Sequence, residues 1–217
     1  MIIFSKKSLR LVPLYLLYIA AVLCTVWASR SLFQEQLITQ MFTDKVYCYL
    51  IVPPFVLGIS LLDESIKRPC IVRMKSRLHA LCYLLFQQYL LTALYLAAWF
   101  VLIVLFAYGS NEQASVIDLF PKYIRYLLSL LVFTNLADLL KRLNIKALST
   151  VPYIAAYILL LLDIQAVTVI TNRYGPSINL MFSWTFYHGI VGYVMLLIFL
   201  VATLAALLSR NRKYDIF

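Results

Sequence analysis

The chain has 217 residues, of which 64% are hydrophobic and only 13% are charged. Soluble domains carry about 25% charged residues, so this composition indicates a membrane protein and leaves no room for a separate soluble domain. Lys and Arg outnumber Asp and Glu by 19 to 9, for a formal net charge of +10. The positions of these basic residues attribute the charge to membrane topology and not to a nucleic-acid-binding surface.

Long apolar runs dominate the chain and do not alternate as β-barrel strands would. In hydrocarbon, backbone amides must be paired within the segment, so such runs predict helices. We therefore expect an all-α integral membrane protein with one transmembrane domain over 1–217 and six transmembrane helices. The expected spans cover about residues 11–29, 46–62, 80–109, 119–140, 147–171 and 189–209.

The first two spans have distinct flanking and internal features. Residues 1–10 begin with an apolar stretch followed by Lys6, Lys7 and Arg10, and such a segment can lie in the cytoplasmic interface of the membrane. The second span contains Pro53 and Pro54, which remove backbone donors and kink a helix.

The segment 63–79 that follows is the longest and most basic cytoplasmic gap. Read as a helix from Ile71, it places Arg73 and Arg77 four residues apart on one face. Such a helix suits docking to an acidic groove on a partner protein, whereas a solvated loop that only sets topology is the alternative. The third span then starts near Ala80 and stays uncharged long enough to tilt or to project from the bilayer.

The last three spans are less uniform. Lys122 and Arg125 fall in the first turns of the fourth span, where their long side chains are expected to snorkel outward. From Tyr174 to Ser209 no residue is charged, and this run is too long for one helix. We expect re-entrant outer helices over its first part, before the last span.

The basic residues alternate between dense and sparse gaps along the chain. Fourteen of the 19 fall in the segments before the first span, after the second, after the fourth and after the sixth, and five fall in the remaining gaps. Cytoplasmic loops retain Lys and Arg, so both termini are expected in the cytoplasm.

The stretch Arg68–Arg77, which reads RPCIVRMKSR, resembles the cytoplasmic segment of small ABC-2-type transporter permeases encoded with bacteriocin or antimicrobial-peptide export systems. In that family an Ile-x-Arg-x-x-Ser-Arg/Lys-like stretch precedes a long third span rich in Leu, Tyr and Trp. The layout of an elbow, six spans, a coupling helix and re-entrant outer helices also resembles the family. The residues that the resemblance assigns to partner docking are Arg68, Arg73, Lys75, Ser76 and Arg77.

The resemblance implies a membrane-spanning subunit of an ABC exporter in the bacterial cytoplasmic membrane. Its partners would be ABC ATPase subunits, a second copy or a homologous permease, and membrane lipids. The chain itself has no glycine-rich phosphate loop, so ATP and Mg would be bound by the partner ATPase, with no cofactor or metal in this chain and no enzymatic activity of its own. The substrate would be a peptide or an amphipathic molecule.

Asp163 lies within the apolar run of the fifth span. A carboxylate at that depth costs about 2.5–3.5 kcal/mol on insertion scales, so it is expected to face other helices or a wet cavity. It is a candidate for the transport pathway or an interface, and an interhelical structural contact is the other interpretation.

Two further classes of function remain open. One is a non-transport membrane immunity or assembly factor that binds a partner within the bilayer. The other is a membrane-embedded lipid enzyme, which the lack of a clustered acid–base set disfavours.

The topology can be tested by cysteine labelling. Cysteines introduced at Gln36 and Glu112 should react with an impermeant maleimide from outside the cell, and cysteines at Lys75 and Arg212 only after the membrane is opened. Labelling at position 75 from outside would overturn the topology.

Overall fold

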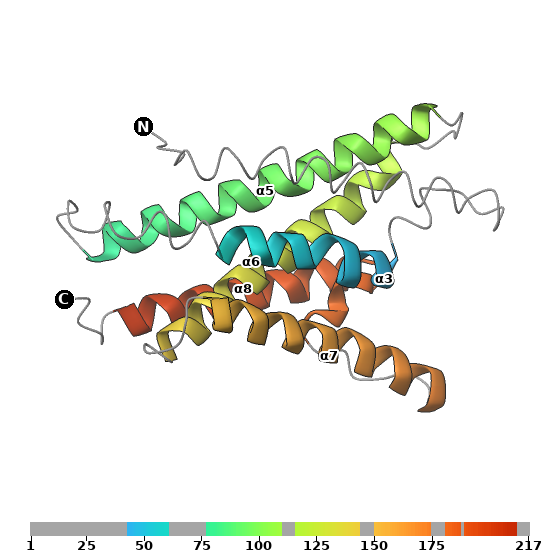
Figure 1. Cartoon of the computed structure of the whole chain (residues 1–217). Coiled ribbons are helices and arrows are strands. Elements are labelled where there is room, and N and C mark those ends of the chain that lie inside the picture. Colours follow the sequence, from blue (N-terminus) through green and yellow to red (C-terminus); the bar gives the residue numbers. More distant parts are fainter. Residues whose placement is uncertain are drawn as a thin grey trace.

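The computed structural model describes residues 43–60, 77–109, 116–143, 150–174, 181–187 and 189–211 (Figure 1). Regular structure in these ranges is helical, without strands, so the predicted all-α fold class is confirmed for the described part of the chain. The expected elbow over 1–10, the first span over 11–29 and nearly all of 63–79 lie outside the described residues. The helices are α3 (Asp44–Val46), a π-helical turn (Tyr47–Ile51) that continues as α-helix through residue 60, α5 (Arg77–Gly109), α6 (Val116–Leu143), α7 (Thr150–Tyr174), a short 3₁₀ helix (Ser183–Phe186) and α8 (Ile190–Asn211).

Successive described helices run in alternating directions, as the colour gradient in Figure 1 shows. The end of the second helix near residue 60, the start of α5, the end of α6, the start of α7 and the end of α8 lie toward one side of the bundle. We call this side the inner end. The opposite side, the outer end, holds the start of α3 and the short 3₁₀ helix that precedes α8.

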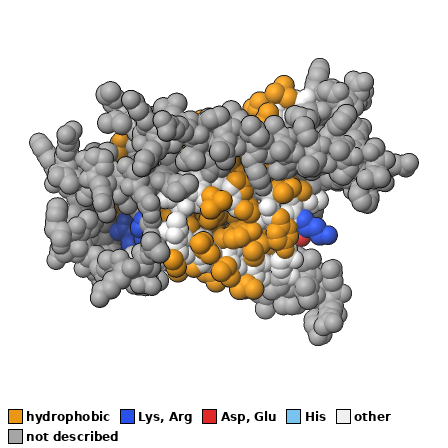
Figure 2. Space-filling view, viewed as in Figure 1, with side chains coloured by type: hydrophobic (Ala, Val, Ile, Leu, Met, Phe, Trp, Pro, Cys, Tyr) orange, Lys and Arg blue, Asp and Glu red, His pale blue; other side chains and the backbone are white. Residues whose placement is uncertain are grey.

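Three described helices are long and apolar enough to cross a membrane. Their apolar stretches are Ala80–Leu105, Leu119–Arg142 and Ile190–Arg210, with 26, 24 and 21 residues. The described apolar part of α7, Thr150–Gln165, is shorter. The face in Figure 2 is covered by hydrophobic side chains at its middle, with charged side chains at both ends. These features support a membrane protein.

Helices α5, α7 and α8 expose many apolar side chains, as a lipid-facing surface requires. Exposed large hydrophobic residues occur on α5 (Phe86, Leu94, Val101, Leu105), on α7 (Ile154, Ile158, Leu159, Leu162) and on α8 (Ile190, Val191, Val194, Leu197, Ile198, Val201).

Helix α6 lies at the centre of the described bundle and contacts α5, α7 and α8. In its apolar stretch 56% is buried within the protein, against 28% in α5 and 22% in α8. This position explains why it is the least apolar of the three. A helix surrounded by protein can carry polar side chains, because neighbouring helices supply their partners.

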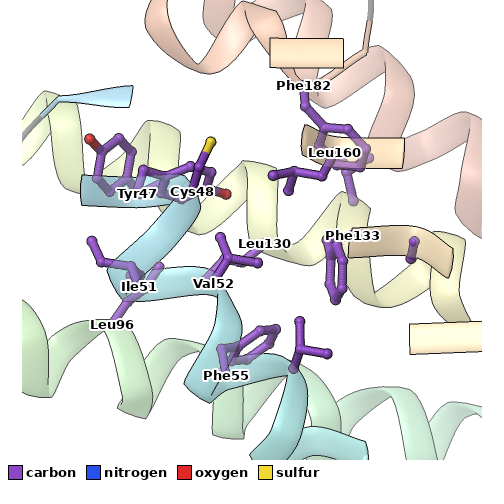
Figure 3. Packing of buried hydrophobic residues seen from close by; sticks show 14 of the residues in the cluster. Tyr47, Cys48, Ile51, Val52, Phe55, Leu96, Leu130, Phe133, Leu160 and Phe182 are labelled. Atoms are coloured by element: carbon purple, nitrogen blue, oxygen red, sulfur yellow. The ribbon is translucent and has the colours of Figure 1, made fainter. Parts of the chain in front are cut away.

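The hydrophobic core joins all of these elements. In Figure 3, Tyr47, Cys48, Ile51, Val52 and Phe55 of the second helix lie among side chains of α5, α6 and α7. The residues from the other elements that this view labels are Leu96, Leu130, Phe133, Leu160 and Phe182. Burying such side chains together sets the order of the helices around α6.

The π-helical turn follows from the two prolines after it. The Val52 N–H donates to the Tyr47 carbonyl, five residues earlier. In that register the next donor would be the backbone nitrogen of Pro53 and the acceptor would be the Cys48 carbonyl, but proline has no N–H. The Cys48 carbonyl is therefore left without its helical partner in an apolar environment.

Tyrosines from neighbouring helices bind the carbonyls of this turn. Tyr157 of α7 donates to the Cys48 carbonyl at 3.0 Å, and Tyr95 of α5 donates to the Ile51 carbonyl at 2.7 Å. A side chain of the turn also binds α6, because the Tyr47 hydroxyl donates a hydrogen bond to the Ser129 hydroxyl at 2.8 Å. Pro53 thus leaves a backbone carbonyl in the core without its helical donor. Side chains of α5, α6 and α7 form hydrogen bonds with the turn.

A double-mutant cycle can test this compensation. Tyr157→Phe should lower the free energy of unfolding in mixed micelles by about 1 kcal/mol, because a buried acceptor loses its donor. In a Pro53→Ala background the restored N–H can serve the Cys48 carbonyl, so the same change should cost less. The control Tyr49→Phe, at an exposed side chain, should have almost no effect. Equal costs in both backgrounds would contradict the assignment.

Candidate functional site

The predicted partner-docking residues are the first candidates. Arg68, Arg73, Lys75 and Ser76 lie outside the described residues, and Arg77 is the first residue of α5, with a side chain that is also outside them. The coupling helix therefore stays a prediction from the sequence. Arg77 is the first described residue of α5, so the docking stretch immediately precedes the described part of the long third helix in the sequence.

Asp163 is buried on α7, with 7% of its surface exposed, and faces the protein. Its Oδ2 accepts a hydrogen bond from the Phe182 backbone N–H, and Ser183 lies beside the carboxylate. The expectation of a protein-facing carboxylate thus fits the structure. The main donor is a backbone amide in the segment before α8, which sequence patterns did not identify.

A second carboxylate lies at the inner end of the bundle. Asp138 of α6 is 6% exposed and accepts hydrogen bonds from the Gln88 amide of α5 at 3.4 Å and from the Tyr153 hydroxyl of α7 at 3.5 Å. These are long contacts within hydrogen-bonding range. They join three helices around one buried acid.

One turn earlier on α6, Asn135 is fully buried and bridges α5 and α8. Its Oδ1 accepts from the Tyr89 hydroxyl at 2.8 Å, and its Nδ2 donates to the Thr203 hydroxyl at 3.2 Å. Thr203 in turn donates to the Phe199 carbonyl of its own helix at 2.8 Å. We call Gln88, Tyr89, Asn135, Asp138, Tyr153 and Thr203 the inner polar network.

Arg125 of α6 differs from its expected placement. The sequence predicted a side chain that snorkels outward, but the side chain is only 8% exposed. It donates to the Tyr187 carbonyl at 2.7 Å, and its guanidinium lies 5.5 Å from the centre of the Tyr193 ring. The side chain thus extends to the segment before α8, whose backbone carbonyl accepts its hydrogen bond.

Together these side chains make α6 the polar axis of an apolar bundle. It is hydrogen-bonded to the turn of the second helix through Ser129, to α5 and α8 through Asn135, and to α7 through Asp138. No group of three or more His, Cys, Asp or Glu residues that could hold a metal ion occurs in the described part of the chain. The arrangement links four helices through polar side chains of α6.

Sequence reasoning found Asp163 but missed the inner polar network as a unit. Asp138 lies near the end of the expected fourth span, 119–140, and Asn135 is uncharged, so the sequence did not mark either as a site residue. The available signal was spacing, because residues 135 and 138 fall on one face of a helix, as do 88 and 92. Which helices these faces meet required the tertiary structure.

No known protein family, curated protein or solved structure matches the chain. The fold and the site therefore define a class only: in the part of the chain that the structure describes, the protein is helical, with three helices long and apolar enough to span a membrane and a polar interior centred on α6.

The inner polar network predicts a stability effect at its centre. Asn135→Leu should lower the free energy of unfolding by about 1–3 kcal/mol, because the Tyr89 and Thr203 hydroxyls lose a buried partner. The control Ser209→Ala removes an exposed hydroxyl that bonds only within α8, and should change stability by less than about 0.5 kcal/mol. Denaturant titration of both variants in mixed micelles makes the comparison. Wild-type stability of Asn135→Leu would show that the network adds nothing.

Proposed function

We propose that this protein is the membrane-spanning permease subunit of an ABC exporter. It would move a peptide or an amphipathic substrate across the bacterial cytoplasmic membrane, powered by a separate ATPase subunit. All six helices would cross the membrane, with both termini in the cytoplasm. The observation that carries the proposal is the polar axis of α6 within an apolar bundle.

Polar groups at such depth are costly and commonly mark pathways or moving parts. Helices that change their relative positions need groups that can exchange partners, and hydroxyls and amides do this at small cost. The network of Asn135, Asp138 and Tyr153 has this chemistry, and it supports a bundle that switches between two arrangements.

In this proposal the partner ATPase subunits bind and hydrolyse ATP. Two permease subunits, identical or homologous, would pair with two ATPase subunits that bind ATP and Mg. The segment 63–79 would dock to the ATPase through Arg68, Arg73, Lys75, Ser76 and Arg77. Because α5 begins at Arg77, movement of the docked segment would pass directly to a helix that bonds α6 through Gln88 and Tyr89.

The proposed substrate class, a peptide or an amphipathic molecule, rests on the resemblance of Arg68–Arg77 to the permeases of peptide export systems. The tyrosine hydroxyls in the described core are bonded to neighbouring helices and support the assembly of the bundle. A membrane immunity or assembly factor is the main alternative, and a membrane-embedded lipid enzyme is a less favoured one.

The proposal predicts that charge at the docking segment couples the two subunits. The tagged chain, purified from its native membrane, should bring along a subunit with a G-x-x-x-x-G-K-[ST] nucleotide loop and vanadate-sensitive ATPase activity. Arg73→Glu with Arg77→Glu should reduce the bound ATPase about tenfold or more, since like charges would meet an acidic groove. Insertion into the membrane should not change.

The matched control is a charge reversal at Arg210 and Arg212, which lie at the C-terminal end of the chain. This variant should retain the ATPase subunit. If the wild-type chain brings no such subunit, the immunity or assembly function is favoured. If both reversals release the ATPase equally, docking is not specific to 63–79.

A further inference from the structure

The segment 181–187 covers the outer end of the bundle. Its 3₁₀ helix, Ser183–Phe186, contacts α6, α7 and α8. Phe182 is buried in the main core, and Phe186 packs against the rings of Tyr47 and Tyr126 at centroid distances of 5.7 and 5.9 Å. The segment therefore packs against the same hydrophobic core as the π-helical turn, at the outer end of the bundle. We call 181–187 the outer segment.

Two buried charges hold the outer segment at its opposite ends. The Asp163 carboxylate accepts from the Phe182 N–H at its start, and the Arg125 guanidinium donates to the Tyr187 carbonyl at its end. The signs match the partial charges at the two ends of a helical turn. Each charge thus has a peptide group of the outer segment as its hydrogen-bond partner.

The outer segment is less completely bonded than the rest of the described bundle. Eight buried side-chain polar atoms in the described residues have no hydrogen-bond partner, and four of them lie in this segment or its two charged partners. Unsatisfied buried groups are costly, so these atoms offset part of the stability that the contacts of the segment provide. The four atoms are Arg125 Nε, Asp163 Oδ1, Trp184 Nε1 and Thr185 Oγ1.

Two glycines allow the close packing of the outer segment against α8 and the backbone conformation that precedes α8. A Cβ on Gly192 of α8 would lie 2.9 Å from the Tyr187 carbonyl oxygen and 3.0 Å from that of Trp184, so only glycine allows this close approach. Gly189 has φ of +104° and open space around it. It connects the outer segment to α8 through a conformation that other residues rarely adopt.

We propose that the outer segment is a latch that closes the outer end of the bundle, held by Asp163 and Arg125 and seated on Gly192. This inference deepens the proposed export function, since an exporter must open its outer end to release substrate. On opening, the Phe182 and Tyr187 peptide groups leave the two charges, and the ring of Phe186 leaves Tyr47. Cys48, which is fully buried next to Tyr47, would then become accessible.

The reactivity of Cys48 tests the latch directly. In the full chain with Cys24, Cys70 and Cys82 changed to Ser, an impermeant maleimide is applied to intact cells and the labelling rate is measured. Asp163→Asn, Arg125→Gln and Gly192→Ala should each raise the labelling rate of Cys48 about tenfold, because each weakens one of the contacts that keep the outer segment in place. Arg125→Lys keeps a charged donor and should restore most of the protection.

The matched control is Asp138→Asn, the same carboxylate-to-amide change at a similarly buried position of the inner end. It should leave Cys48 protected. An equal rise in this control would indicate general loosening and overturn the latch. Unchanged protection of Cys48 in latch variants that still assemble would also overturn the latch. If the variants of Asp163 and Arg125 do not accumulate in the membrane, Gly192→Ala provides the test, because it leaves both charges in place.

The labelling needs neither ATPase nor substrate, so it separates the latch from the proposed function. Faster labelling in a chain that binds no ATPase subunit would support the latch and reject the exporter. An ATPase complex whose Cys48 stays protected in every latch variant would support the exporter and reject the latch.

Discussion

The central constraint on this structure is that polar side chains of α6 have no water to bind inside an apolar bundle. Each must find a partner on another helix or bear the cost of being unsatisfied. Ser129, Asn135 and Asp138 therefore determine which faces of the second helix, α5, α7 and α8 turn toward the centre. Apolar packing fills the space between these contacts, but it does not by itself select one rotation of each helix.

The same constraint acts on the backbone at the π-helical turn. Pro53 removes the donor that the Cys48 carbonyl would otherwise receive, and Tyr157 supplies one from a different helix. A local feature of the sequence thus creates a requirement that only a neighbour can meet. The second helix is held to α5, α6 and α7 by tyrosine hydroxyls as well as by its apolar side chains.

The two ends of the bundle meet this constraint in different ways. At the inner end, side chains bond side chains, and partners can be exchanged without moving the backbone. At the outer end, the charges of Asp163 and Arg125 bond peptide groups of one short segment. Movement of that segment breaks both contacts together, which makes the outer end a two-state element. An asymmetry of this kind suits a protein whose two ends respond to different events.

The sequence by itself determined the helical class and, within the described ranges, the approximate places of the helices, because apolar length and paired backbone amides depend only on local composition. It also identified Asp163 as a carboxylate that must face protein. Patterns could not show that Arg125 is buried, that Asn135 and Asp138 meet α5, α7 and α8, or that Asp163 bonds the Phe182 amide. These pairings join residues distant in the chain, and they depend on how each helix is rotated about its axis. Tertiary packing decides that rotation, and the rotations seen in the structure bring these polar groups to their partners.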